Sequence, residues 1–306
     1  MKRTFTYKLH IFLFLLPALV LFIGILIAPI IMSAYYSFHE FNLVSNSDME
    51  YMGFENYRIL FSSMLTNPNT GKLYANSMYM GDALGHALIL AALSTFIQLP
   101  LALIIALKLS KGIRGERTYL SIFFMPVLIS TVVIGQLWLK IYNPDYGILN
   151  VALRHVGLES WTRIWLGKRE TALGAVFVPT LWQYVGYHML LLYAGVKSVP
   201  MELREAAMLD GASERQVNRH IVIPYIKPII RISVIFAVTG SLKSFDLIYV
   251  LTNGGPFHST EVPSTLMISM LFLRNRYGMG STIAVLLILL CFGFALLINA
   301  VFREED

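Results

Sequence analysis

Polar and charged side chains interrupt several strongly apolar stretches of this sequence, and their types are suited to binding chemistry. Amide and charged groups hydrogen-bond a polar solute, while tryptophan and tyrosine rings offer flat surfaces against which a solute can stack. The candidates for such contacts are Gln136, Trp182, Gln183, Tyr187, Lys243 and Asp246. The alternative is structural, because aromatic residues often pack or lie at membrane interfaces, and glutamine amides bridge helices.

Lys243 and Asp246 are the charged members of this set, and they are three residues apart. On one continuous helix this spacing puts both on the same face, where the two charges neutralise each other. Ionisable groups inside a membrane segment are functional candidates by default. This pair lies near the expected outer end of its helix, however, which favours a structural or gating role over contact with a solute.

Catalytic chemistry is not indicated by the remaining reactive residues. The seven histidines are scattered, no Ser/His/Asp set is convincing, and no Cys/His cluster has metal-ligand spacing. The single cysteine, Cys291, lies inside an apolar stretch and has no partner for an internal disulfide. We therefore predict no catalytic residues and no metal site, which argues against an intramembrane hydrolase.

The composition indicates that lipid is the main solvent of the chain. Of its 306 residues, 56% are hydrophobic and only 14% are charged, whereas soluble domains carry about 25% charged residues. The net charge is +6, but lysine and arginine are spread over short segments between apolar stretches. They form no basic stripe interleaved with aromatic residues, so nucleic acid is not a predicted partner.

The apolar stretches are long enough to predict six membrane-spanning helices, since a crossing needs about 20 residues. The expected spans are residues 11–37, 83–107, 119–141, 171–196, 228–251 and 282–302. The first is too long for the apolar region of a signal peptide. It also lacks a small-residue cleavage site, because Pro29 follows Ala28. It is therefore expected to remain as an uncleaved first helix.

The spans divide the chain into four expected parts. Residues 1–37 are an N-terminal segment with the first helix, 38–82 an extracytoplasmic loop, 83–302 a core of five helices, and 303–306 a cytoplasmic tail. Lysine and arginine are enriched in the segments that are cytoplasmic when both termini are cytoplasmic. The charge bias thus predicts cytoplasmic termini and a second inner loop at residues 197–228.

That inner loop has the pattern of two short helices joined by a tight corner. Gly211 is expected to end the first helix as a C-terminal cap. Ser213 and Gln216 have the spacing of a capping box, which opens the second helix. Pro224 is expected to end that helix. On these features alone the segment can also be an ordinary amphipathic loop.

The same loop carries a longer string that resembles the EAA loop of ABC-importer permeases. Its residues are Glu205, Ala206, Ala207, Asp210, Gly211, Ala212, Ile221 and Pro224. Residues 53–57 (Gly-Phe-Glu-Asn-Tyr), 182–187 (Trp-Gln-Tyr-Val-Gly-Tyr) and 244–256 resemble further signatures of the sugar permeases in that family. The resemblance covers nearly the full length and points to the maltose/glycerol-3-phosphate permease type.

The resemblance implies an all-α membrane protein with six transmembrane helices, the type I ABC importer permease fold and cytoplasmic coupling helices. It implies a transport subunit rather than an enzyme, in the cytoplasmic membrane of a bacterium or archaeon. With a homologous second permease, this subunit would form the path for a sugar or oligosaccharide. An extracytoplasmic solute-binding protein would deliver the sugar, and no cofactor would bind this chain. ATP would be used by separate ATP-binding subunits, in agreement with the missing G-x-x-x-x-G-K-[ST] string.

The chain departs from the family pattern in the second coupling helix. The family usually has a bulky aromatic residue near the position of Asn218. Val217 or Ile221 is expected to take its place in the groove of the ATPase.

The competing class is a secondary carrier or channel for a small polar solute, which needs no ATPase partner. A proton-coupled carrier should hold a membrane-embedded carboxylate without a nearby cation, but Lys243 accompanies Asp246. A carrier also has no need of the loop from Glu205 to Pro224.

Overall fold

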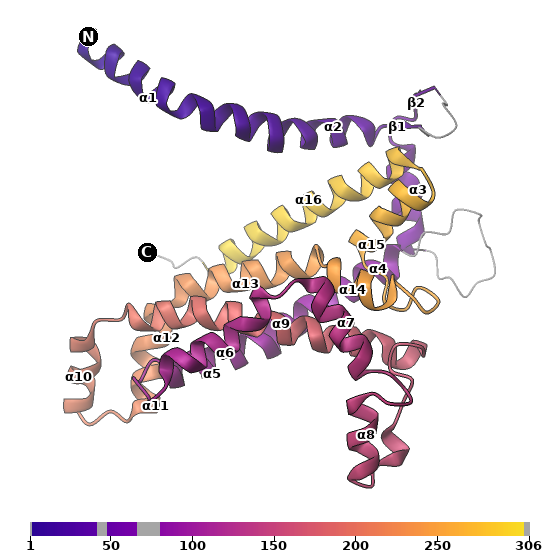
Figure 1. The fold of residues 1–306 in the computed structure, drawn as a ribbon. Helices are drawn as coiled ribbons and strands as arrows, with labels where there is room; N and C mark the ends of the chain where they lie inside the picture. Colours follow the sequence, from indigo (N-terminus) through magenta and orange to yellow (C-terminus); the bar gives the residue numbers. More distant parts are fainter. Residues whose placement is uncertain (1, 42–47, 66–79, 303–306) are drawn as a thin grey trace. The chain divides into compact units, whose positions relative to one another are not determined.

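Helices make up almost all of the regular structure in the computed structural model, which describes residues 2–41, 48–65 and 80–302 (Figure 1). Parts of the expected outer loop (42–47 and 66–79) and the expected tail (303–306) lie outside the described residues. The chain forms two compact units. One comprises Met1–Thr66 with Met267–Leu286, and the other Asn67–Leu266 with Leu287–Asp306.

The first unit begins with one long apolar helical segment. It consists of α1 (Lys2–Leu21), the π-helical turn η1 (Phe22–Ile27) and α2 (Ala28–Tyr36). Pro29 stands at the start of α2, directly after the wider π-turn. A π-turn at this place accommodates the missing backbone N–H of proline without ending the helix. The expected first span is thus continuous from Ile11 to Tyr36, and none of its apolar window is buried within the chain.

The 53–57 signature organises the rest of this unit. Strands β1 (His39–Glu40) and β2 (Glu50–Tyr51) pair antiparallel, and α3 (Glu55–Leu65) follows. The fully buried Asn56 donates through Nδ2 to the carbonyl oxygens of Ser37, at 3.0 Å, and of His39, at 2.9 Å. The Tyr57 hydroxyl lies 2.7 Å from Ser37 Oγ. The signature therefore has a structural role, because its side chains satisfy backbone groups where α2 ends.

The same unit also contains the turn before the last helix. This turn includes η6 (Ser269–Leu273), and the last helix is α16 (Tyr277–Val301). Thr282 donates to the Ser37 carbonyl oxygen at 3.2 Å. Gly278 packs directly on the backbone of His39, where a Cβ atom has no room.

The second unit holds the remaining helices. A long segment comprises α4 (Met80–Leu93), η3 (Ser94–Gln98) and α5 (Leu99–Leu109). It is followed by α6 (Glu116–Leu128), α7 (Thr131–Ile141), α8 (Ile148–His155), η4 (Glu159–Trp161) and α9 (Arg169–Lys197). Next come α10 (Met201–Leu209), α11 (Glu214–Val217), η5 (Asn218–Val222) and α12 (Ile223–Tyr225). The unit continues through α13 (Lys227–Leu242), α14 (Asp246–Thr252) and α15 (Pro263–Ile268).

The expected spans are only partly reproduced as long apolar helices. Within the described residues, four helices are long and apolar enough to cross a membrane: Ile11–Tyr36, Met80–Leu109, Lys227–Thr252 and Tyr277–Val301. The span expected at 119–141 is instead two helices, α6 and α7, bent by 95°. Ser130 between them has an extended ψ of 131°, which breaks the helical path. Counted as one broken span, this pair is a fifth candidate.

Helix α9, expected to be a span over 171–196, is 29 residues long but is not among the strongly apolar helices. Its middle carries Trp182, Gln183 and His188. The helix packs against α5 and α6 and has many buried positions. A helix that neighbouring helices cover needs a less apolar surface than one that faces lipid. The count of six is therefore not reached by length and apolarity alone.

A close helix crossing explains one glycine of the 182–187 signature. The side chain of an alanine at Gly186 would overlap the backbone of Phe123 and Phe124 in α6. Glycine therefore lets the two backbones approach and places the polar middle of α9 within the bundle. Elsewhere α13 packs on α4, and α14 packs on α7.

Candidate functional site

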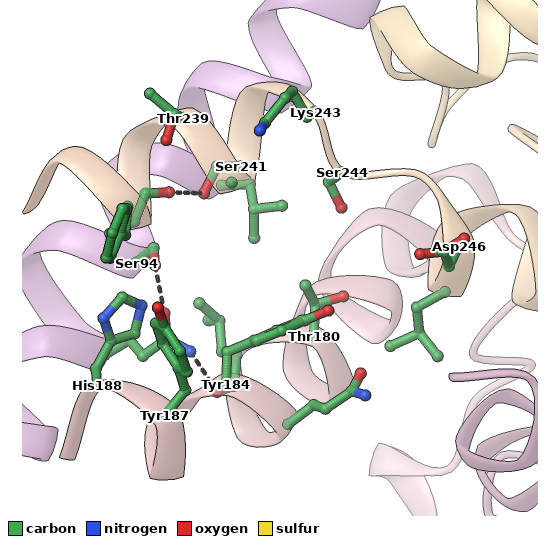
Figure 2. A pocket seen from close by; sticks show the side chains of 18 of the residues that line it. Ser94, Thr180, Tyr184, Tyr187, His188, Thr239, Ser241, Lys243, Ser244 and Asp246 are labelled. Carbon is green, nitrogen blue, oxygen red and sulfur yellow. Dashed lines mark hydrogen bonds between the residues drawn. The ribbon is translucent and has the colours of Figure 1, made fainter. Parts of the chain in front are cut away.

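A cavity of about 330 Å³ lies between η3, α9, α13 and the start of α14 in the second unit (Figure 2). Its walls combine aromatic rings with hydroxyl, amide and charged groups. The polar lining comes from Ser94, Gln98, Thr131, Thr180, Gln183, Tyr184, Tyr187, His188, Thr239, Ser241, Lys243, Ser244 and Asp246. Phe236 and Phe245 contribute further rings. A concave site on which polar groups converge between aromatic and aliphatic side chains is the usual form of a small-molecule site.

The structure brings together most of the sequence-predicted solute contacts. Gln183, Tyr187, Lys243 and Asp246 line the cavity. Gln136 and Trp182 do not. Gln136 is exposed on α7, and the Trp182 ring packs edge-on against Trp138, with centroids 5.9 Å apart. The Trp182 ring thus has a packing contact, and its contact with a solute stays a prediction.

Sequence reasoning missed several lining residues, chiefly small hydroxyl residues. Thr180 and Ser241 look unremarkable because each hydroxyl donates to a carbonyl of its own helix, at 2.9 Å and 2.7 Å. Such a hydroxyl oxygen still has a lone pair for a solute donor. Ser94 and Gln98 carried a usable signal, since they are four residues apart in an otherwise apolar helix. Ser94 donates to the Gln98 side chain, and Gln98 donates to the Leu181 carbonyl oxygen at 2.6 Å.

Gln183 is the most informative polar residue of the cavity. Its side chain is 2% exposed, and its Oε1 atom has no hydrogen-bond partner in the described part of the chain. A buried carbonyl oxygen without a partner costs about 1–3 kcal/mol. Gln183 is therefore a buried acceptor without a partner in the described cavity wall, which a solute hydroxyl could reach only if the wall opens.

The expected pairing of Lys243 with Asp246 is wrong. Helix α13 ends at Leu242 with Lys243 as its C-cap, and α14 begins at Asp246, so the two side chains do not share a helix face. No ion pair joins them among the described residues, and Figure 2 shows Ser244 between them. Phe245, with φ −144° and ψ −64°, makes the break. The cavity consequently has an ammonium group and a carboxylate that each remain available for other partners.

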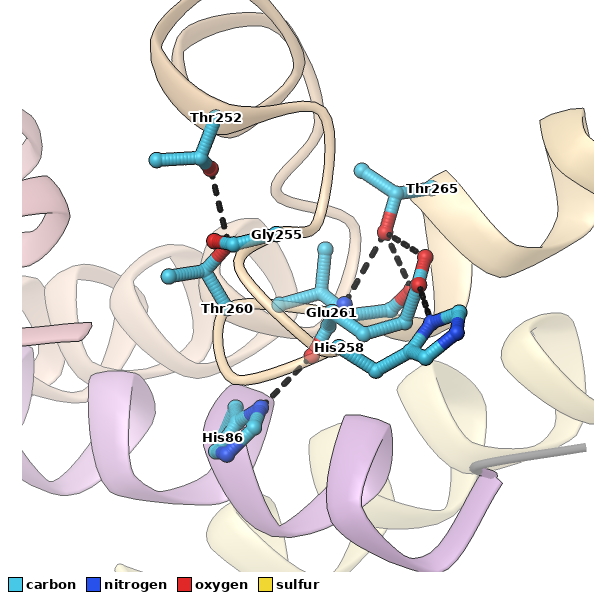
Figure 3. A network of polar contacts seen from close by, with 8 residues as sticks. His86, Thr252, Gly255, His258, Thr260, Glu261 and Thr265 are labelled. Carbon is cyan, nitrogen blue, oxygen red and sulfur yellow. Dashed lines mark hydrogen bonds and ion pairs between the residues drawn. The ribbon is translucent and has the colours of Figure 1, made fainter. Parts of the chain in front are cut away.

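The end of the 244–256 signature builds a tightly bonded loop beyond α14 (Figure 3). The Thr260 hydroxyl contacts Thr252 Oγ1 at 2.7 Å and donates to the Gly255 carbonyl oxygen at 2.8 Å. The buried Glu261 carboxylate lies 2.7 Å from His258 Nδ1 and accepts from Thr265 Oγ1 at 2.7 Å. In addition, His86 of α4 donates to the Glu261 carbonyl oxygen at 2.7 Å. Glu261, which follows the signature in the chain, thus fastens this loop to α4.

The 197–228 loop folds as the expected helix–corner–helix, at the opposite end of the second unit from α8 (Figure 1). Gly211 has φ +86° and stands just after α10. The Gly211 N–H bonds to the Met208 carbonyl oxygen, and the Ala212 N–H bonds to that of Ala207, both at 3.0 Å. These two bonds form a Schellman motif. The expected glycine cap is therefore confirmed.

The second half of the loop confirms the capping box and corrects its expected end. Ser213 N–H donates to Gln216 Oε1 at 2.8 Å, and the reciprocal contact is present. The helix does not stop at Pro224, because it continues through η5 to Tyr225. Pro224 stands at the start of α12, directly after the π-helical η5, where proline is tolerated.

The two faces of the loop have different surroundings. Val217, Val222 and Ile226 form a buried cluster with Val196 and Val199, and Ala207, Ala212 and Ile221 pack against it. The expectation that Val217 or Ile221 replaces the missing aromatic at Asn218 is therefore wrong for Val217, which is only 2% exposed, and is disfavoured for the partly buried Ile221.

The outward face of the loop is formed mainly by α10. Glu205 and Ala206 are exposed there, and Leu209 is 89% exposed. Of the two alanines in the EAA string, Ala207 packs inward and Ala206 is open to a partner. Within the described residues, no group of three or more His, Cys, Asp or Glu side chains is placed to hold a metal ion.

Comparisons with known proteins cover most of this chain. Residues 98–304 match the family described as "Binding-protein-dependent transport system inner membrane component". A probable ABC transporter permease protein of Bacillus subtilis is 33% identical over 95% of this chain and 94% of its own length. A xylose/arabinose import permease protein of Haloferax volcanii is 30% identical over 82% of this chain and 77% of its own length. A diacetylchitobiose uptake system permease protein of Streptomyces coelicolor is 28% identical over 99% of this chain and 84% of its own length.

Solved structures show the same fold. A chain of a bacterial ABC transporter involved in the import of the acidic polysaccharide alginate superposes with a TM-score of 0.81. The match covers 99% of this chain and 98% of the other, at 20% sequence identity. At this identity the likeness concerns the fold, which is that of a type I ABC importer permease.

Proposed function

Because the chain belongs to the family of inner membrane components of binding-protein-dependent transport systems, we propose that it forms one half of a sugar-conducting path in an ABC importer. The observation that carries the proposal is the cavity built around residues 183–188 of α9 and the α13–α14 junction. Relatives named for xylose/arabinose and diacetylchitobiose support a carbohydrate.

The chemistry of the cavity suits a carbohydrate. Sugar hydroxyls both donate and accept, and the cavity offers the Gln183 oxygen and Asp246 as acceptors and Lys243 as a donor. The rings of Tyr184 and Tyr187 also line the cavity (Figure 2) and supply the flat surface that the apolar face of a sugar needs.

A matched pair of glutamine substitutions tests this assignment. Gln183→Leu should raise the KM for sugar uptake about 2- to 12-fold, because it removes one hydrogen bond worth about 0.5–1.5 kcal/mol. Gln136→Leu removes the same amide from α7, outside the cavity, and should leave KM unchanged. The measurement is uptake of labelled xylose, maltose and diacetylchitobiose by cells that express the complete transporter. Equal KM values for the two variants would show that Gln183 does not contact the transported sugar.

Energy for transport is assigned to separate ATP-binding subunits that dock on residues 197–228. The outward face of α10 supports this role, because an exposed leucine beside Glu205 and Ala206 offers an apolar anchor with a polar surround. This chain itself binds no ATP in the proposal, and it works with a homologous second permease and an extracytoplasmic solute-binding protein. The helix pair would carry ATPase motion into the spans as alternation of access.

The docking role predicts a defined loss on substitution of Leu209. Leu209→Glu should reduce co-purification of the ATP-binding subunit and sugar-stimulated ATP hydrolysis, because it puts a charge into the apolar contact. Leu158→Glu is the matched control, since Leu158 is also exposed but lies between α8 and η4, at the other end of the unit. Retention of the ATP-binding subunit by Leu209→Glu would contradict docking through α10.

The proposed topology places both termini and the 197–228 loop in the cytoplasm. The proposed parts are residues 1–37, the extracytoplasmic loop 38–82, the core 83–302 and the tail 303–306. Single cysteines in a Cys291→Ser background test this arrangement in intact cells. A cysteine at Ser213 should resist an impermeant outside reagent, whereas one at Tyr146, before α8, should react. Labelling of the cysteine at position 213 from outside would show that the proposed orientation is wrong and that the loop faces outward.

A further inference from the structure

The turn that joins α5 to α6 carries two charged residues whose partners both belong to the region of the 197–228 loop. Lys111 forms an ion pair with Glu214, the first residue of α11. Glu116, the first residue of α6, lies 3.3 Å from Lys197 Nζ at the end of α9. This short turn and the first residue of α6 therefore contact the 197–228 loop at two places. One is the start of the loop, and the other lies just after the corner at Gly211.

Glu116 is the more enclosed of these groups. Its side chain is 20% exposed, and the Tyr193 hydroxyl donates to the same carboxylate oxygen that faces Lys197. Lys197 also lies 5.6 Å from the centre of the Tyr193 ring. The charges suit the helix ends, because an acid is favourable at the N-terminus of α6 and a base at the C-terminus of α9. The carboxylate thus holds the start of α6 to the last turns of α9.

The turn has a defined backbone geometry. Gly112 and Gly115 adopt φ values of +75° and +84°, conformations that glycine enters at low cost. Ser110 donates through Oγ to the Leu107 carbonyl oxygen at 3.0 Å, and the Glu116 N–H bonds to the Ile113 carbonyl oxygen at 3.1 Å. Lys111 and Glu116 therefore belong to one short turn whose backbone is hydrogen-bonded where α5 ends and where α6 begins.

A third polar contact ties α10 itself to α9. Arg204 donates through Nη2 to the Val196 carbonyl oxygen at 2.5 Å. A cation that binds a carbonyl group at a helix C-terminus also meets the favourable end of the helix dipole. Both halves of the helix–corner–helix therefore have polar links to membrane helices, in addition to the apolar cluster below them.

We propose that Lys111 and Glu116 are positioning residues of the importer, which make the α5–α6 turn a second transmitter of ATPase motion into the membrane helices. The inference rests on the proposed coupling role of residues 197–228. Movement of α11 would displace Lys111 through Glu214, and movement at the end of α9 would displace α6 through Glu116. Helix α6 in turn packs on α9 beside the cavity, so this route reaches the proposed sugar path.

Charge exchange tests the Lys111–Glu214 contact. Lys111→Glu and Glu214→Lys each replace attraction by repulsion and should lower sugar-stimulated ATP hydrolysis about two- to fivefold in proteoliposomes of the whole transporter. The double exchange restores the attraction and should recover most of the loss. Recovery distinguishes positioning from a direct contact of either residue with the ATPase, which exchange would not repair. Additive losses in the double variant would overturn the proposal for this pair.

Lys108→Glu is the matched control for the turn. Lys108 is an exposed base in the last turn of α5, and in the described chain no carboxylate lies within ion-pair distance of it. Its reversal should leave stimulated hydrolysis unchanged. A loss equal to that of Lys111→Glu would mean that only the net charge of this face matters, and the proposal would fail.

The Glu116 contact has its own readout. Glu116→Gln keeps an acceptor for Tyr193 but removes the charge opposite Lys197, and Glu116→Ala removes both. Transported sugar per ATP hydrolysed should fall further for alanine than for glutamine, with equal amounts of assembled complex. If both variants transported as much sugar per ATP as the unaltered transporter, Glu116 would not be a positioning residue. If the unaltered transporter shows no sugar-stimulated hydrolysis, the proposed function fails instead, so the two failures are distinguishable.

Discussion

The contact between α6 and α9 gives a sharp prediction about Gly186. A Cβ atom at this position would lie 2.5 Å from the carbonyl carbon of Phe123 and 2.9 Å from Phe124 Cα, besides overlapping the Phe123 oxygen. These are backbone atoms, so no rotamer change relieves the overlap and the two helices must move apart. Gly186→Ala should therefore lower stability and disturb the cavity formed by the neighbouring Tyr184 and Tyr187.

A control in the same helix sets the magnitude of this effect. A Cβ atom at Gly174 has nothing within 4 Å, so Gly174→Ala should be neutral or gain up to about 1 kcal/mol of helix propensity. Overpacking at Gly186 costs about 1–3 kcal/mol. The two variants should thus differ by roughly 1–4 kcal/mol, or an apparent melting-temperature gap on the order of 2–10 °C.

The assay is thermal unfolding of the purified permease in detergent, combined with sugar uptake by cells that express the transporter. Gly186→Ala should unfold at the lower temperature and transport poorly, whereas Gly174→Ala should match the unaltered protein in uptake. The same melting temperature and the same uptake for both variants would refute a close α6–α9 crossing at Gly186.

Three further predictions concern the corner, the cavity charges and the outer unit. Gly211→Val should weaken stimulated ATP hydrolysis because φ is +86°, at a strain of about 1–3 kcal/mol, whereas Gly211→Asn should be tolerated; equal activity of the two would refute the backbone requirement. Neutral substitution of Lys243 and Asp246 should give independent losses of uptake, since the two are not paired; recovery in the double variant would contradict this. Burial raises the pKa of Glu40 and outweighs the opposing effect of Arg276 at 3.4 Å, so the folded state favours the protonated carboxyl group. The contribution of the protonated Glu40 carboxyl group to the free energy of unfolding is complete below its ordinary pKa of 4.5. This contribution is lost as pH rises through the raised pKa of the folded state. Glu40→Gln should therefore gain melting temperature relative to the unaltered permease between pH 4.5 and pH 7; a constant difference would refute the shift.

Patterns within a few residues of each other made the local features predictable. The glycine cap at Gly211 and the capping box of Ser213 and Gln216 depend on backbone groups close in the chain, so residue types at fixed spacing specify them. The long apolar stretches likewise indicate membrane helices, because lipid selects apolar residues along a whole span. The 53–57 signature was recognised in the sequence, but its structural role was not. That role, holding the end of α2, became visible only from the hydrogen bonds to the backbone of Ser37 and His39.

By itself, then, the sequence determined the membrane class, the helix–corner–helix of residues 197–228 and the likeness to sugar permeases, because each depends on composition or short-range spacing. Only the tertiary structure decided which polar residues meet. The cavity collects residues from 94–98, 180–188 and 236–247, segments brought together by helix packing that spacing along the chain does not encode. The break at Phe245, which separates Lys243 from Asp246, and the inward turn of Val217 are likewise results of packing. A residue's neighbours on other helices settle whether a polar side chain faces a cavity, a partner or the core.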